Sequence, residues 1–91
     1  MQRSSLGNGN VDLLRSVLEQ DFVQLRFLEG LLQEARTRRD PDNVAVICSK
    51  IAVLVNEMRD LLGQLPPSER SRNERDIASV ENNIAMICTR N

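Results

Sequence analysis

Few side chains in this chain of 91 residues could do chemistry, and the first is an aspartate among leucines. Asp21 lies between Leu18 and Leu25 in a helical apolar pattern. A buried carboxyl with a raised pKa can act as a general acid or base. The chain contains no histidine, and no second acid shares the pattern around Asp21. We therefore predict that proton transfer is not its role and that the chain is not an enzyme.

A structural role for Asp21 requires a partner, because an unpaired charge among leucines costs several kcal/mol. If the chain makes a helical hairpin that turns near residue 40, positions whose numbers sum to about 80 lie opposite each other. This places Asp21 opposite Met58 and Arg59. We expect an Asp21–Arg59 pair at the edge of the seam. The alternative is that a polar residue at this position simply fixes the register of the helices.

Two cysteines, Cys48 and Cys88, are the only candidate nucleophiles of the thiol type. They lack the spacing of a zinc site, and both lie among apolar residues in helical patterns. We predict free, buried thiols that act as small hydrophobic side chains. The sequence predicts no metal, no cofactor and no small-molecule substrate.

The densest basic cluster is Arg36, Arg38 and Arg39, at the end of the first predicted helix. Cations at this end of a helix compensate its dipole, and arginine also binds phosphate. The formal net charge of −1 argues against a general affinity for nucleic acid. Binding of duplex DNA at these arginines becomes plausible if several copies bring them together.

Hydrophobic periodicity defines the helices that position these residues. Asp40-Pro41, a favoured cap and first helical residue, separates a helix at about 11–38 from one at about 41–64, and Pro66-Pro67 ends the second. A break this short between long helices forces an antiparallel hairpin. The apolar stripe of the second helix is a heptad: Val44, Ile47, Ile51, Leu54, Met58, Leu61 and Leu65.

The predicted fold class is all-α: a long antiparallel helical hairpin plus a shorter third helix, self-associating. Residues 1–10 are expected to form a flexible N-terminal arm, 11–65 the hairpin used for oligomerisation, and 66–91 a linker and the third helix. The start of the chain lacks the pattern of a signal peptide, and no apolar run reaches 18 residues. These features predict a cytoplasmic protein with no membrane partner.

Self-association is predicted from apolar residues that lie off the main stripes. Val23 and Phe27 are on the first helix, and Val46 and Val53 are on the second. Together they would make an apolar patch on the outside of the hairpin, and such patches usually mark a partner surface. The alternative is that the third helix folds back and covers them.

The stretch LRFLEGLLQEARTRRDPDNVAVICSKIAVLVNEMRDLLGQLPPSER, residues 25–70, resembles the hairpin of small terminase subunits from tailed phages of actinobacterial hosts. In that family a leucine-rich helix ends in a charged turn that contains aspartate. The second helix then carries a pattern that this chain matches at Ala45, Ile47, Ser49 or Lys50, Ile51, Leu54, Glu57, Met58 and Leu61. A loop of proline and charged residues follows in both.

This resemblance implies a ring-forming, non-catalytic subunit of a viral DNA-packaging motor, acting in the host cytoplasm. Such a subunit selects viral DNA and regulates a large terminase subunit that is an ATPase and nuclease. Many small terminases carry a helix-turn-helix, and none of ordinary length is visible in this sequence. The alternative function is therefore a small helical adaptor or regulator that binds another protein through the hairpin and does not contact DNA.

Overall fold

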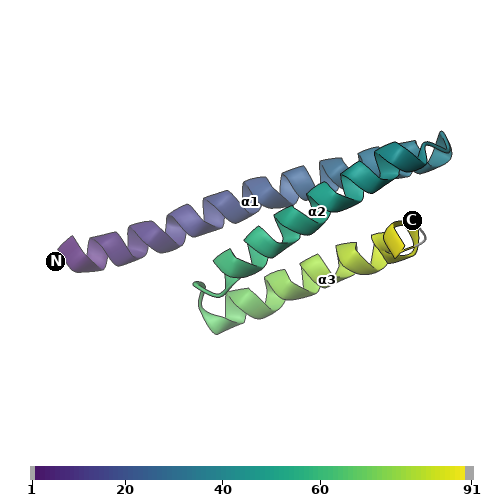
Figure 1. The fold of residues 1–91 in the computed structure, drawn as a ribbon. Helices are drawn as coiled ribbons and strands as arrows, with labels where there is room; N and C mark the ends of the chain where they lie inside the picture. Colours follow the sequence, from purple (N-terminus) through teal and green to yellow (C-terminus); the bar gives the residue numbers. More distant parts are fainter. Residues whose placement is uncertain (1, 90–91) are drawn as a thin grey trace.

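The computed structural model describes residues 2–89 of the chain, and the side chains of residues 11–88. Three helices follow one another: α1 (Gln2–Thr37), α2 (Pro41–Leu62) and α3 (Pro67–Thr89). No strand occurs in this described part. The all-α class and the third helix are confirmed (Figure 1).

The turn between α1 and α2 is short, and its geometry makes the hairpin antiparallel. Arg39 takes a left-handed conformation, with φ of 57°. The Asp40 side chain accepts a hydrogen bond of 3.2 Å from the backbone N–H of Asn43. Pro41 occupies the first turn of α2, where its missing N–H costs nothing. The predicted capping by Asp40 and Pro41 is therefore confirmed.

The first residues of α1 and α3 differ from the prediction. α1 extends back to Gln2 rather than starting near residue 11, so the segment predicted as a flexible arm is part of this helix. α3 begins at Pro67, so the predicted linker before the third helix is shorter than a turn. Proline is well tolerated in the first turn of a helix, so the Pro66-Pro67 pair both ends one helix and begins the next.

The core runs along the hairpin, and α2 supplies its centre. The buried side chains of α2 are Val44, Ile47, Ile51, Val55, Met58 and Leu62. The predicted heptad is thus right at five of its seven positions, including Leu65 just after the helix. Val55 and Leu62 replace Leu54 and Leu61, which are half-buried. Two causes explain the shift: an α-helix has 3.6 rather than 3.5 residues per turn, and α2 packs against helices on two sides.

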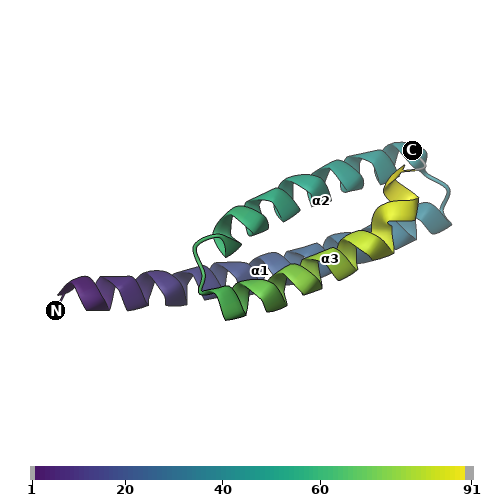
Figure 2. The ribbon, with the colours of Figure 1, turned by 90° about the horizontal axis from the view of Figure 1, so that it is seen from below.

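The third helix runs back along the hairpin and buries Ile77, Ile84 and Ile87. In Figures 1 and 2 its C-terminal end approaches the first turns of α2. There Cys48 and Cys88 form a disulfide, with their Cα atoms 5.7 Å apart. The prediction of free thiols is wrong, because a short stripe of isoleucines brings the end of α3 against α2 and places the two side chains in bonding geometry.

The molecule is an elongated bundle, 56 × 18 × 15 Å in extent. The N-terminal part of α1 projects beyond the end of α2 (Figure 1), because α2 has only 22 residues against the 36 of α1. Among the described residues, none of the three helices has the length and apolar content needed to span a membrane.

Candidate interaction surface

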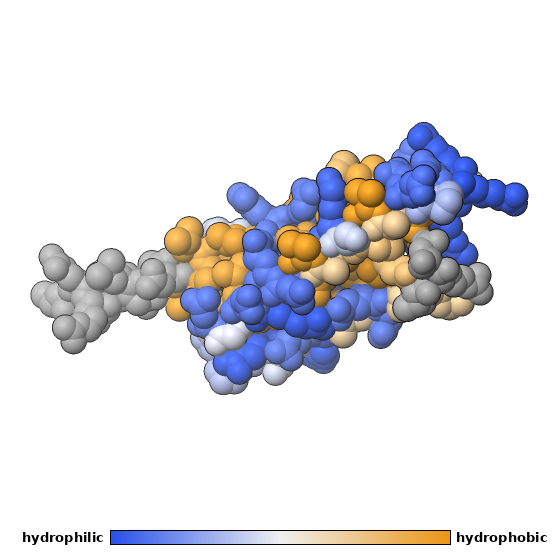
Figure 3. All heavy atoms as spheres, in the orientation of Figure 1, coloured by the Kyte–Doolittle hydropathy of each residue, from blue (hydrophilic) through white to orange (hydrophobic). Residues whose placement is uncertain are grey.

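Four large apolar side chains remain exposed on one face of the hairpin. Val23 is 69% exposed, Phe27 59%, Val46 52% and Val53 70%. They are the four residues predicted from the sequence to lie off the main stripes. We call them the hairpin patch. Figure 3 shows hydrophobic atoms gathered over α1 and α2 on this side of the molecule.

The third helix leaves the hairpin patch uncovered, so the alternative in which it covers these residues is wrong. On α2, the positions that face α3 include Cys48, Ala52 and Val55. Val46, Lys50, Val53 and Glu57 are two residues away from that series, which corresponds to about 200° around a helix. α3 and the hairpin patch therefore lie on opposite sides of α2.

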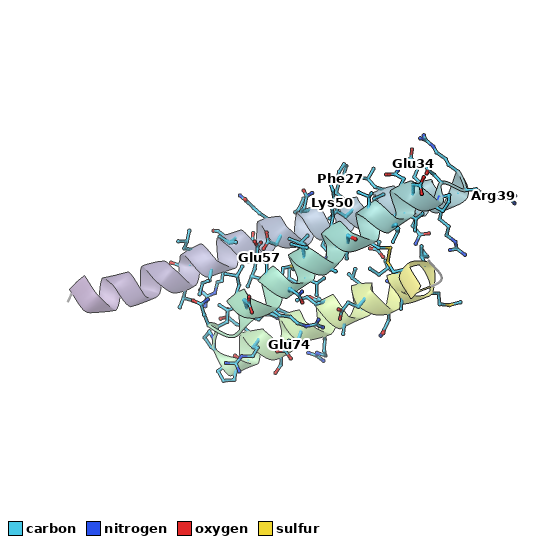
Figure 4. All side chains as sticks on the ribbon, in the orientation of Figure 1. Phe27, Glu34, Arg39, Lys50, Glu57 and Glu74 are labelled. Atoms are coloured by element: carbon cyan, nitrogen blue, oxygen red, sulfur yellow. A yellow bond between two sulfur atoms is a disulfide. The ribbon has the colours of Figure 1, made fainter. Side chains whose placement is uncertain are left out.

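A groove between α1 and α2 runs through the hairpin patch. It has a volume of about 530 Å³. Its lining residues are Gln24, Phe27, Leu28, Leu31, Ser49, Lys50, Val53, Leu54 and Glu57. Phe27, Lys50 and Glu57, all labelled in Figure 4, lie along this side of the hairpin. The groove is thus apolar along its floor, with a cation and an anion one heptad apart on α2.

The position of Asp21 is the main correction to the predicted site. Asp21 lies against Glu57, and Arg59 pairs with Glu81 instead. Burial, and then the hydrogen bond to Glu57 and its charge, raise the pKa of Asp21 from 3.8 to about 6. Its Oδ2 atom is buried without a hydrogen-bond partner. A carboxyl and a carboxylate therefore meet at one end of the groove.

Sequence reasoning missed Glu57 because it assumed that no second acid lies near Asp21. The residue numbers of Asp21 and Glu57 sum to 78, close to the value of about 80 that the hairpin predicts for opposing residues. Glu57 lies two residues before Arg59, about 200° around the helix, so it faces the groove while Arg59 faces α3. A search of all acids with sums near 80 would have found it.

Arg59 instead ties α2 to α3. Its two Nη atoms bind the carboxylate of Glu81 at 2.5 and 3.0 Å, and both side chains are partly exposed. Arg15 makes a comparable link from α1 to α3, with its Nε 2.7 Å from Oε1 of Glu69. The arginines thus position the third helix rather than neutralise the buried aspartate.

The three arginines predicted as a phosphate site lie at the hairpin tip, and all are exposed. Arg38 is paired with Glu34 at 2.6 Å. Asp40 and Asp42 lie in the same turn, so three acids balance three arginines there. A single copy therefore presents a locally neutral tip, which does not attract a phosphate backbone strongly.

The described residues hold no group of three or more side chains that could bind a metal ion. Comparison with protein families, with curated proteins and with solved structures finds no match. The candidate site is therefore defined by its own geometry: an exposed apolar groove with two opposite charges.

Proposed function

We propose that this chain is a non-catalytic, self-associating helical protein that acts by binding helices through the hairpin patch. The observation that carries this proposal is the exposure of Val23, Phe27, Val46 and Val53 on one grooved face. Contiguous apolar surface of this kind is uncommon on small monomeric proteins and marks association sites.

Chain size supports the same proposal. A chain of 91 residues buries a smaller fraction of its surface than a larger domain does, so its stability as a monomer is limited. Association through the hairpin patch removes further apolar area from water, at about 25 cal/mol per Å².

The test is the mass in solution. We expect the native chain to exceed its monomer mass of 10.3 kDa at tens of micromolar in light scattering. A variant with Val46→Glu and Val53→Glu should be monomeric yet largely helical by circular dichroism. Leu13→Glu with Met86→Glu is the matched control, because these exposed apolar residues lie outside the hairpin patch. A native monomer overturns the proposal.

The role of a phage small terminase subunit is our second proposal, and the exposed arginines at the hairpin tip are the observation that favours it. In this proposal, association gathers the tips of several copies around duplex DNA, beside a large terminase subunit. The adaptor function needs only the hairpin patch. Binding of duplex DNA separates the two, and the arginine variant described in the Discussion tests it.

The Cys48–Cys88 disulfide bears on the proposed cytoplasmic location. Disulfides persist in oxidising compartments and are rare in a reducing cytoplasm. In a cytoplasmic setting, we expect the bond to be reduced in cells and to form after release. Alkylation of free thiols in intact cells, followed by mass spectrometry, tests the location: unmodified Cys48 and Cys88 would argue for an oxidising compartment.

A further inference from the structure

We propose that the groove of the hairpin patch is occupied by a second copy of this chain in an antiparallel, two-fold arrangement, with Lys50 of each copy paired with Glu57 of the other. The inference rests on the proposed self-association and adds the number of copies, their orientation and the residues that set their register.

The first step is the level at which the two helices of one hairpin meet. Phe27 of α1 and Val53 of α2 line the same groove, and their numbers sum to 80. They therefore lie at one level along the hairpin. A two-fold axis that crosses the face at this level, perpendicular to the helices, passes close to both side chains.

The second step is the pairing that this axis imposes on α2. If the axis lies between Val53 and Leu54, α2 meets α2 of the second copy antiparallel, and opposing residues sum to 107. Lys50 then faces Glu57, and Val53 faces Leu54. Val46 faces Leu61, which is half-buried in its own copy. Every apolar residue thus meets an apolar residue, and each charge meets its opposite.

The same axis gives a consistent pairing on α1. Opposing residues there sum to 54, so Phe27 faces Phe27 of the second copy and Val23 faces Leu31. Gln24 faces Gly30, and a Cβ atom at Gly30 would meet nothing within 4 Å, so the space for the glutamine is open. Aromatic pairs of this kind add to the energy of apolar burial.

The competing arrangement has its two-fold axis along the helices. It places α1 of one copy against α2 of the other, with opposing residues again summing to about 80. Lys50 then faces Leu31, and Glu57 faces Val23. Both charges would be covered without a partner, which is costly. Charge complementarity therefore favours the antiparallel arrangement.

An isologous interface of this type uses the same surface on both copies and closes at two. It exposes no unused half of the interface for a third copy. The inference therefore predicts a dimer rather than the ring that the terminase resemblance implies, because a ring requires a head-to-tail interface.

Charge reversal tests the pairing. Lys50→Glu makes a copy with two acids in the groove, and Glu57→Lys makes a copy with two lysines. Each variant alone should weaken association by more than about tenfold in dissociation constant, because like charges face each other twice. An equimolar mixture of the two should form a heterodimer of twice the chain mass, because both cross-pairs are then opposite. The double variant with both changes should dimerise like the native chain.

Arg75→Glu is the matched control, since it makes the same charge change on an exposed position of α3. Mass is measured by sedimentation or light scattering, and helicity by circular dichroism. Rescue in the mixture shows that both single variants are folded. A native dimer whose mass is unaffected by Lys50→Glu overturns the register but leaves the proposed self-association standing. A native monomer overturns both, and a native mass above that of a dimer overturns the two-fold arrangement.

Discussion

At the scale of single residues, the distinctive feature is a carboxyl pair in an otherwise apolar seam. Asp21 is held against Glu57, and burial is the largest cause of its raised pKa. Above pH 6 the folded state must accommodate two negative charges that face each other. Asp21 therefore makes the stability of the hairpin depend on pH within a range that solution experiments reach easily.

We expect stability to fall as the pH rises from about 4 to about 6. The pKa of Asp21 is about 6 in the folded state against 3.8 ordinarily, so the folded state binds more protons than the unfolded state in this range. Linkage then lowers the free energy of unfolding by about 1–3 kcal/mol across the range. Urea unfolding at several pH values measures this step, the decrease in the free energy of unfolding with pH.

Substitution of Asp21 tests whether this residue causes the loss of stability between about pH 4 and pH 6. Asp21→Asn should abolish it and make the protein more stable than native above pH 6. Asp21→Leu should likewise be neutral or stabilising at neutral pH, with a looser register between the helices. Asp60→Asn, on the exposed surface of α2, should leave the step in place. A step that persists in Asp21→Asn would exclude this residue as its source.

Arg59→Ala should cost little, contrary to what an Asp21–Arg59 pair would imply. The Arg59–Glu81 pair is partly exposed, with side-chain exposures of 45% and 38%, and such pairs contribute about 0–1 kcal/mol. Arg15→Ala is the comparison, because it breaks a similar pair with Glu69. The free energies of unfolding of the two variants, measured in urea, should agree within about 1 kcal/mol. A much larger loss for Arg59→Ala would instead support a buried pair between Arg59 and Asp21.

At the scale of elements, the three helices are held together unequally. α1 and α2 share a long seam, whereas α3 rests on a short row of isoleucines, two partly exposed ion pairs and the disulfide. The disulfide joins α3 near its C-terminus to α2, and the 63–66 turn joins the other end. α3 is thus fixed at both ends, and the Cys48–Cys88 bond is the one that can be removed chemically.

Reduction of the disulfide should loosen α3 before the hairpin. Cys48 and Cys88 are 40 positions apart, and closing a loop of this length contributes about 4 kcal/mol in the chain-entropy treatment. We expect the unfolding midpoint to fall on addition of a dithiol reductant, with hydrogen exchange rising first in α3. A Cys48→Ala, Cys88→Ala variant should start from the lower midpoint and be unaffected by reductant. An identical midpoint with and without reductant in the native chain would contradict this role.

At the scale of the whole molecule, charge decides whether DNA is a partner. The chain has a formal net charge of −1, and its hairpin tip is locally neutral. Binding of duplex DNA at low salt therefore requires both association and Arg36, Arg38 and Arg39 together. Replacing the three by alanine should abolish any such binding without changing the mass of the assembly.

The measurement is a titration of duplex DNA against the native chain, the triple arginine variant and the Val46→Glu, Val53→Glu variant, at several salt concentrations. Affinity that falls steeply with salt and is lost in both variants supports the packaging role. Equal binding by all three removes the hairpin tip from the mechanism. No binding by the native chain favours the adaptor.

The candidate surface was largely visible in the sequence, and the reason is local. Val46 and Val53 are seven residues apart on one helix, and a short turn fixes which residues of α1 lie beside them. Exposure of Phe27 and Val53 therefore followed once the main stripes were identified. Lys50 and Glu57 were not recognised as part of this surface, because charged residues on a helix are ordinarily read as solvated.

The sequence by itself determined the helices, the turn at Asp40-Pro41 and the antiparallel hairpin, because periodicity, capping and proline act within a few residues. The tertiary structure decided what depends on the direction of a whole helix. The path of α3 set the partner of Arg59, brought Cys48 to Cys88, and left the hairpin patch open. The exact phase of α2 against α1 gave Asp21 a carboxylate neighbour instead of an arginine. Glu57 and Arg59 are two residues apart, so the rotation of α2 about its own axis decides which of them faces Asp21. Packing of α2 against helices on both of its sides sets that rotation.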